Sequence, residues 1–185
     1  MVLFWANKKE QKETMNPIQI LNYQSKHQRY FEKFNREWIE EYFVMEPVDE
    51  FVLTNPDVSI LKPGGAILMA TYDGLMAGTV ALRKVDGLTY EFTKMAVDKA
   101  FRRKGIASAL CYASFKKAAD LGATNVILYS NSKKNGNAIE MYRKIGFHEL
   151  PLEPGIYERA DIKMKIELET TDNGPPIKTP FTIHH

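Results

Sequence analysis

The residues best placed to do chemistry in this chain form a short basic loop, Arg102-Arg103-Lys104-Gly105. The loop follows a strand-like run over 90–97 and opens a helix-like run that ends near Leu121. The first turn of a helix has unpaired N–H groups and the positive end of the helix dipole, so phosphate groups bind there readily. Gly105 has no Cβ, which lets the backbone approach a ligand closely. The pattern predicts a site for a phosphate-bearing ligand.

The run from Arg102 to Ala107 has the pattern R-x-x-G-x-A, which resembles the pyrophosphate-binding motif Q/R-x-x-G-x-G/A of the GNAT superfamily of N-acetyltransferases. The preceding M-A-V-D resembles the end of that family's central strand. Further along, N-G-N-A-I-E-M-Y-R-K-I-G-F resembles the family's N-x-x-A-x-x-x-Y…GF segment. The three pieces occur in the family's order and spacing, and the resemblance covers residues 16–168 without assigning a subfamily.

This resemblance implies that the ligand is the co-substrate acetyl-CoA. Its pyrophosphate would lie on the backbone N–H groups of 103–108, and its pantetheine arm would pair with the backbone of 95–97 as an added strand does. A backbone N–H of 95–97 would then stabilise the oxyanion; the alternative is that 95–97 is only core strand. The cofactor-binding residues implied in this way are Met95, Ala96, Val97, Arg102, Arg103, Lys104, Gly105, Ile106, Ala107, Ser108, Asn135 and Asn137.

The two asparagines have a competing explanation. Asn135 matches the family's asparagine that contacts the CoA arm, and Asn137 is close enough to take that role instead. Asparagine is also favoured at helix N-caps, so a purely structural role stays open.

Tyr142 matches the family's tyrosine and is the expected general acid, because a phenol with a pKa of about 10 can protonate a leaving thiolate. Tyr142 also shares a helix face with Ala138, Met141 and Ile145, which predicts a core position. Both hold if the ring lies in the core and the hydroxyl faces the sulfur.

Glu91 is the expected general base. Side chains alternate along a strand, so Glu91 and Met95 should share one face and Phe92 and Lys94 the other. Bulky Phe92 suggests that its face lies under a helix, which would leave Glu91 open to the acceptor. The alternatives are a carboxylate paired with Lys94 or Arg83, and a water chain as the base.

The acceptor is expected to bind in the helical region 27–55, where the family builds its acceptor pocket. That region is aromatic and acidic, which favours a small cationic amine or an amino-acid-like acceptor. The alternative is that the aromatic residues are core and the acids a solvated helix face. A non-catalytic acyl-CoA sensor, a transferase that uses another acyl-CoA, and a protein amine as acceptor also stay open.

Composition bounds the remaining questions. The net charge of +2 gives no indication of nucleic-acid or membrane binding, and the single cysteine allows no intrachain disulfide. No metal-ligand spacing occurs, so no metal is expected. The protein is expected to be cytoplasmic, and the resemblance suggests a homodimer.

Length and pattern predict one N-acetyltransferase domain over 16–168, an N-terminal extension over 1–15 and a flexible tail over 169–185. The predicted fold is α/β, a mixed and mostly antiparallel sheet flanked by helices. In the family a bulge in the central strand opens the cofactor gap, so a splay is expected between the fourth and fifth strands. The predicted elements are strands over 18–23, 66–72, 75–83, 89–97, 125–129, from 147 and 157–168, and helices from 25, 47, 104 and about 137.

Overall fold

The computed structural model describes residues 16–153, 155 and 157–168. The predicted extension over 1–15 and tail over 169–185 lie outside the described residues. Within them the sheet has seven strands in the order β1-β2-β3-β4-β5-β7-β6. The strands are β1 (Ile18–Asn22), β2 (Ala66–Tyr72), β3 (Leu75–Lys84), β4 (Thr89–Val97), β5 (Asn125–Ser130), β6 (His148–Leu150) and β7 (Ile162–Glu167).

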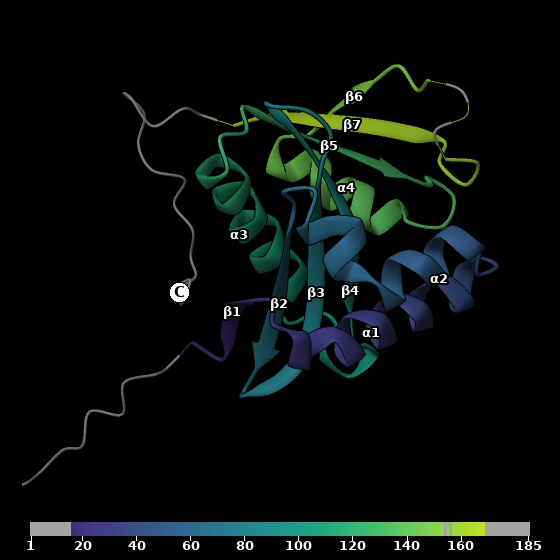
Figure 1. Cartoon of the computed structure of the whole chain (residues 1–185). Helices are drawn as coiled ribbons and strands as arrows, with labels where there is room; N and C mark the ends of the chain where they lie inside the picture. Colours follow the sequence, from purple (N-terminus) through teal and green to yellow (C-terminus); the bar gives the residue numbers. More distant parts are fainter. Residues whose placement is uncertain (1–15, 154, 156, 169–185) are drawn as a thin grey trace, which may run out of the picture.

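Helices cover both faces of this sheet (Figure 1). The helices are α1 (Gln28–Tyr42), α2 (Pro47–Thr54), α3 (Ile106–Asp120) and α4 (Gly136–Ile145). Only β4 and β5 pair in parallel; all other neighbouring strands of the described sheet are antiparallel. The predicted mixed, mostly antiparallel fold is therefore confirmed.

Strand β2 shows why the core has two halves. Its alternate residues Leu68 and Ala70 are buried in the cluster that contains α3 and α4 side chains. Ile67 and Met69 point the other way, into the cluster under α1 and α2. A strand buried on both faces reads as a continuous apolar run, and this run was recognised from the sequence with its bounds correct.

Strands β4 and β5 separate part-way along their length, as predicted. They pair only between Thr89–Glu91 and Asn125–Ile127, although β4 continues to Val97. Beyond Glu91 the β5-facing backbone of β4 has no partner in the described sheet. The opening between the two strands is where a ligand can meet strand backbone.

A bulge in β4 accompanies the splay. Thr79 pairs with Ala96 and Ala81 with Thr93, so one residue of β3 is opposed by two residues of β4, Lys94 and Met95. Lys94 has a φ of 51°, in the left-handed region. The bulge interrupts the two-residue alternation. The expectation that Lys94 shares a face with Phe92 is consequently wrong: the Lys94 side chain bonds to Asp49 of α2.

The segment before β7 also differs from expectation. A strand was predicted from residue 157, but β7 begins at Ile162. Residues 157–161 form a loop instead, held by Asp161, whose carboxylate accepts hydrogen bonds from the backbone N–H and hydroxyl of Ser132 at 2.6 and 2.8 Å. The loop carries side chains into the site described below.

Gly78 of β3 tests how closely the sheet and α3 approach at the bulge. A Cβ at Gly78 would lie 3.0 Å from the carbonyl oxygen of Ala96 and 3.2 Å from Leu110 of α3. We expect Gly78→Val to lower the free energy of unfolding by about 1–3 kcal/mol, because the added methyl groups overpack this contact.

Chemical denaturation measures this loss. Gly87→Val is the matched control, because a Cβ at Gly87 meets no atom within 4 Å. Equal stabilities of the two variants would contradict the tight approach.

Candidate active site

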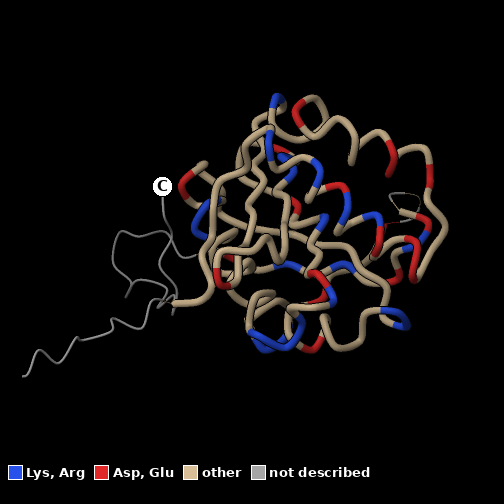
Figure 2. The backbone as a smooth tube through the Cα atoms, turned by 90° about the horizontal axis from the view of Figure 1, so that it is seen from below, with Lys and Arg blue, Asp and Glu red and all other residues tan. Residues whose placement is uncertain are grey.

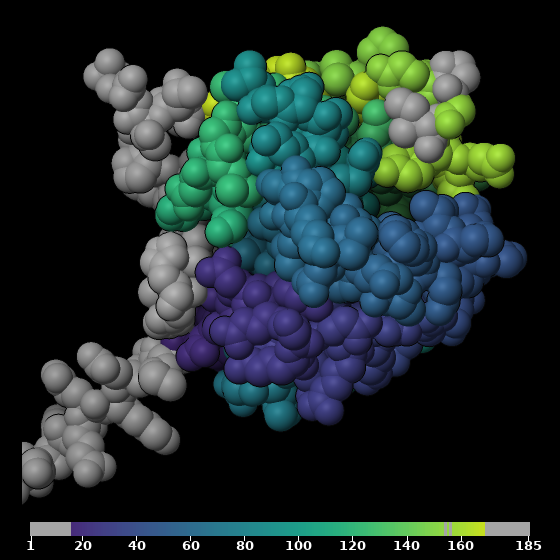
Figure 3. Space-filling view, viewed as in Figure 1, coloured from purple at the N-terminus to yellow at the C-terminus, as the bar shows by residue number. Residues whose placement is uncertain are grey.

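The splay opens into a cavity of about 740 Å³ between α1, α2, β4, β5 and the loop before β7. Its apolar wall comes from α1 and its neighbours, with Trp38, Ile39 and Phe43 among the lining residues. In Figure 3 the yellow-green segment near residue 160 lies directly against the blue surface of α2, which closes one side of the site. Both predicted catalytic residues, Glu91 and Tyr142, line this cavity.

Glu91 lies at the cavity with its side chain 2% exposed. Its Oε2 accepts hydrogen bonds from the Arg83 guanidinium, one of them from Nε at 3.0 Å. Its Oε1 accepts one from the Tyr157 hydroxyl at 2.9 Å. The pairing with Arg83 that the sequence left open is thus present, and Tyr157 is a second partner.

Tyr157 lies beside Glu91 and lines the same cavity. The residue is 41% exposed and its ring packs edge-on against Tyr129, with 5.2 Å between the ring centroids. Burial, followed by the nearby negative charge of Glu91, raises the pKa of the Tyr157 phenol. The phenol therefore keeps its proton and donates a hydrogen bond to the carboxylate.

Asp49 of α2 anchors a second charged cluster. Its side chain is 3% exposed and accepts hydrogen bonds from Lys94 at 2.9 Å and from Arg159 at 2.5 Å. Burial alone would raise the pKa of Asp49, but the hydrogen bonds and charges of Lys94 and Arg159 outweigh it and leave this pKa below its usual value.

These contacts change the expected charge of the acceptor region. Glu46 lies 3.5 Å from Arg159, Asp49 has two cationic partners, and Glu50 forms two hydrogen bonds of 2.8 Å with Arg36. Acidic side chains that looked like a solvated rim are therefore neutralised within the protein. Basic and acidic positions are also interspersed along the tube in Figure 2.

Tyr142 comes from α4 and approaches the cavity from the opposite face of the sheet. Its ring packs edge-on against Phe92 and Phe147, at centroid distances of 5.8 and 5.7 Å. Among the described residues its hydroxyl has no hydrogen-bond partner. Burial, with a smaller effect of Cys111, holds the pKa of Tyr142 well above its usual value. The phenol is therefore neutral, and Tyr142 lines the cavity.

The basic loop has the geometry of an anion site. Arg103 and Gly105 have φ values of 62° and 81°, and these left-handed turns lead into α3. Helix α3 begins at Ile106, two residues later than predicted. The first bond of the helix runs from the N–H of Ala109 to the carbonyl of Gly105 at 3.0 Å, so the preceding N–H groups have no partner within the helix. A Cβ at Gly105 would meet only one atom, of Ile18 at 3.9 Å, so the approach is open.

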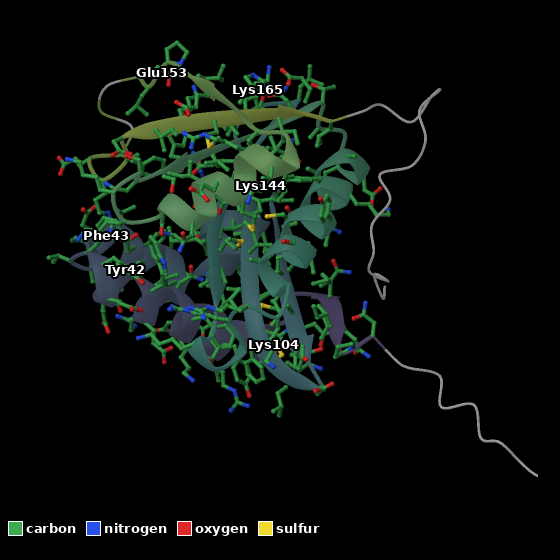
Figure 4. The ribbon with its side chains drawn as sticks, turned by 180° about the vertical axis from the view of Figure 1, so that it is seen from behind. Tyr42, Phe43, Lys104, Lys144, Glu153 and Lys165 are labelled. Atoms are coloured by element: carbon green, nitrogen blue, oxygen red, sulfur yellow. The ribbon has the colours of Figure 1, made fainter. Side chains whose placement is uncertain are left out.

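The remaining predicted residues divide between two places. Asn135 is the N-cap residue of α4 and lines the large cavity, and its side chain donates to the Ser130 hydroxyl at 3.3 Å. Ser108 and Asn137 line a smaller cavity of about 400 Å³ whose walls come from α3 and α4. Figure 4 looks onto this face of the molecule, with Lys104 labelled at the start of α3 and Lys144 on α4.

Comparison with known proteins decides the family. The sequence profile of the Acetyltransferase (GNAT) family matches residues 24–147, about two thirds of the 185 residues. The chain belongs to the GNAT acetyltransferase family.

Individual relatives agree with this assignment. An uncharacterized N-acetyltransferase of Mycobacterium tuberculosis is 36% identical over 88 residues, 48% of this chain and 56% of the relative, so the match spans about half of that protein. A GNAT acetyltransferase of Staphylococcus aureus Mu50 superposes with a TM-score of 0.72 at 21% identity, over 82% of this chain and 99% of its own. YncA of Salmonella typhimurium, solved with its cofactor acetyl-CoA, gives 0.63 at 15% identity, over 87% and 99%.

Two further findings apply to the part of this GNAT chain that the structure describes. No helix there is long and apolar enough to cross a bilayer. No group of three or more His, Cys, Asp or Glu side chains is arranged there to hold a metal ion.

The sequence does not identify Tyr157 and Arg159 as site residues, and it does not identify Asp49 as the partner of Lys94. Tyr157 and Arg159 were placed in a strand, and Lys94 was placed on the wrong face. No local pattern reveals the Arg159–Asp49 contact, because 110 residues separate the two. The one available signal was the crowding of charged residues in 158–163, which is unlike a buried strand.

The Asp49 cluster makes a prediction about stability and pH. In Asp49→Asn, Lys94 loses its counter-charge and Arg159 keeps only Glu46, and we expect the free energy of unfolding at neutral pH to fall by about 3 kcal/mol. Because the pKa of Asp49 is lowered in the folded state, its stabilisation is complete above the unfolded pKa of about 3.9 and is lost as the pH falls through the lower folded value. The variant should therefore lose less stability than wild type below about pH 4.

Denaturant titrations across this pH range measure both effects. Glu50→Gln removes a surface partner of Arg36 and should change stability little. Parallel pH profiles for wild type and Asp49→Asn would contradict the assigned role of Asp49.

Proposed function

We propose that this protein is an acetyl-CoA-dependent N-acetyltransferase that transfers the acetyl group directly to a primary amine. The observation that carries the proposal is the splay of β4 from β5, which leaves β4 without a β5 partner beyond Glu91 at a cavity that Met95 and Tyr142 both line. Family membership supports the proposal, and so does YncA, which has the same fold and was solved with acetyl-CoA. Acetyl-CoA supplies the activated acetyl group as a thioester.

The residues of this chain fit such a co-substrate. We assign the pyrophosphate to the start of α3, where Gly105 leaves the approach open and Arg102, Arg103 and Lys104 are exposed. We assign the pantetheine arm to the backbone of Met95, Ala96 and Val97, with Asn135 and Asn137 beside it. The backbone N–H groups of Ile106, Ala107 and Ser108 are assigned as hydrogen-bond donors to the pyrophosphate. The backbone N–H groups of 95–97 are also the proposed oxyanion donors.

Tyr142 is the proposed general acid. Its hydroxyl reaches the cavity from among aromatic rings, and its raised pKa keeps it protonated at neutral pH. A proton held at this oxygen can be given to a departing thiolate. The position of Tyr142 supports both roles that the sequence left open, a core position for its ring and a catalytic role for its hydroxyl.

The acceptor is proposed to bind in the cavity of about 740 Å³ as a small amine or amino-acid-like molecule. The cavity contributes apolar and aromatic contacts from Trp38 and Phe43, together with the polar group of Tyr157. Since Asp49 and Glu46 are already ion-paired, selection would rest on shape and apolar contact more than on charge. A homodimer, a cytoplasmic location, and the absence of nucleic-acid and membrane binding stay predictions.

Acetyl-CoA should stabilise the protein against thermal unfolding. Ligand at 100 times its dissociation constant contributes about 2.7 kcal/mol, which corresponds to a rise of roughly 5–10 °C in Tm for a chain of this size. ATP is the control for phosphate binding alone and should give little shift. Arg103→Gly suits the left-handed backbone at that position but lacks the charge, and it should show a smaller shift with acetyl-CoA. No shift with acetyl-CoA at millimolar concentration would rule out the assigned site.

Replacing Tyr142 by phenylalanine separates catalysis from binding. We expect Tyr142→Phe to lower kcat by about 100-fold or more, because the proton donor is lost, while acetyl-CoA affinity changes little. Steady-state kinetics with a panel of primary amines and calorimetric titration of acetyl-CoA measure the two quantities. Tyr30→Phe, a partly exposed tyrosine on α1, is the matched control.

The same experiment distinguishes the alternatives. Equal, small changes in kcat and affinity would remove Tyr142 from the mechanism. Acetyl-CoA binding with no CoA release for any amine would favour the acyl-CoA sensor, and turnover with a longer acyl-CoA would favour a different donor.

A further inference from the structure

The geometry around Glu91 does not suit a base that touches the acceptor. The Glu91 side chain is 2% exposed, and both of its oxygens are engaged within the protein. Arg83 donates to Oε2, and the Tyr157 hydroxyl donates to Oε1 at 2.9 Å, with 3.2 Å to Oε2. Arg83 and Tyr157 line the cavity beside Glu91, so an amine that enters it finds the carboxylate already bonded to both.

Tyr157 is the partner that can face an amine. Arg83 is cationic and has only hydrogen-bond donors, so it offers an amine no acceptor. A phenol oxygen has one O–H and two lone pairs. The O–H of Tyr157 is directed at Glu91 and the Arg83 guanidinium also bonds to the phenol oxygen, so one lone pair is what the oxygen can present to the cavity that Tyr157 lines.

We propose that Tyr157 receives the acceptor amine, with its phenol oxygen accepting a hydrogen bond from the amine N–H. Glu91 is then a positioning residue that fixes the direction of the Tyr157 O–H, and Arg83 balances the charge of Glu91. The proposal rests on the proposed acetyltransferase function and deepens it by naming the amine-binding group. It involves binding and orientation, and no bond is broken at Tyr157.

The loop that carries Tyr157 is fixed well enough for this task. Asp161 binds Ser132, Arg159 binds Asp49, and the Asn131 side chain donates to the carbonyl of Arg159 at 2.8 Å. The Tyr157 ring is further supported by its edge-on contact with Tyr129. A binding group must be held by its neighbours to orient a substrate, and these contacts supply that support.

The raised pKa of Tyr157 agrees with the geometry. Burial and the charge of Glu91 favour the neutral phenol and outweigh the opposing effect of Arg83, which keeps the O–H directed at the carboxylate.

Tyr157→Phe tests the proposal directly. The variant keeps the ring and its contact with Tyr129, and removes only the hydroxyl. With an amine that wild type acetylates, we expect KM for the amine to rise about 10-fold while KM for acetyl-CoA changes less than about 2-fold. Tyr30→Phe on α1, which is not among the cavity residues, should match wild type.

Variants of Glu91 separate positioning from base catalysis. Glu91→Gln retains a carbonyl oxygen that can accept from Tyr157, so most of the amine affinity should be kept, whereas Glu91→Ala should resemble Tyr157→Phe. Because both residues act through one contact, the Glu91→Ala/Tyr157→Phe double variant should be no worse than either single variant. If Glu91 were itself the base, Glu91→Gln would abolish turnover, because an amide cannot take the proton of the amine.

An ultraviolet difference titration follows phenol ionisation without relying on activity. The Tyr157 phenol is identified as the titration that disappears in Tyr157→Phe. In Glu91→Gln this phenol should ionise at lower pH than in wild type, because the carboxylate charge no longer opposes ionisation. An unchanged titration would show that the two groups are not in contact in solution. An unchanged KM for the amine in Tyr157→Phe would overturn the proposal while wild-type turnover upholds the function. Absence of turnover in wild type, with acetyl-CoA still stabilising the protein, would instead refute the proposed function.

Discussion

The buried carboxylate of Asp49 is the constraint on which the site depends. It joins Lys94 in the β4 bulge and Arg159 in the loop before β7, positions that are 45 and 110 residues away along the chain. A carboxylate with a side chain 3% exposed is stable only when cations and hydrogen bonds compensate its lost hydration. Helix α2, the bulge and the loop are therefore tied to one another, and together they form three walls of the cavity.

The bulge explains why the cavity and the charge cluster occur together. The left-handed backbone at Lys94 lets β4 keep its pairing with β3 while its far edge departs from β5. The same turn redirects the Lys94 side chain to the α2 side of the sheet, where Asp49 receives it. One extra residue in a strand thus opens a gap for a ligand on one edge and supplies a cation to the wall beside it.

Sequence patterns were sufficient where the determining forces are local. The apolar run of β2, the bounds of β4 and the glycine that opens α3 all follow from periodicity or backbone conformation. The side to which Lys94 points could not be predicted, because a bulge has no reliable composition and the alternation rule assumes that none is present. The partners of Asp49 and Glu91 were also hidden, since distant segments meet only in the folded chain; the acids of α2 therefore resembled a solvated helix face.

Tyr142 and Glu91 line the same cavity but have different surroundings. Tyr142 is surrounded by rings and stays neutral because its phenolate would be poorly solvated. Glu91 has two hydrogen-bonding partners that compensate its burial. The carboxylates of Asp49 and Glu91 are thus paired before any ligand arrives, and the uncharged polar side chains that line the cavity are hydroxyls and amides, among them Tyr142, Tyr157 and Asn135. Reactants bound there would meet fixed dipoles in place of mobile charges, and an arrangement set in advance requires little reorganisation when charge develops.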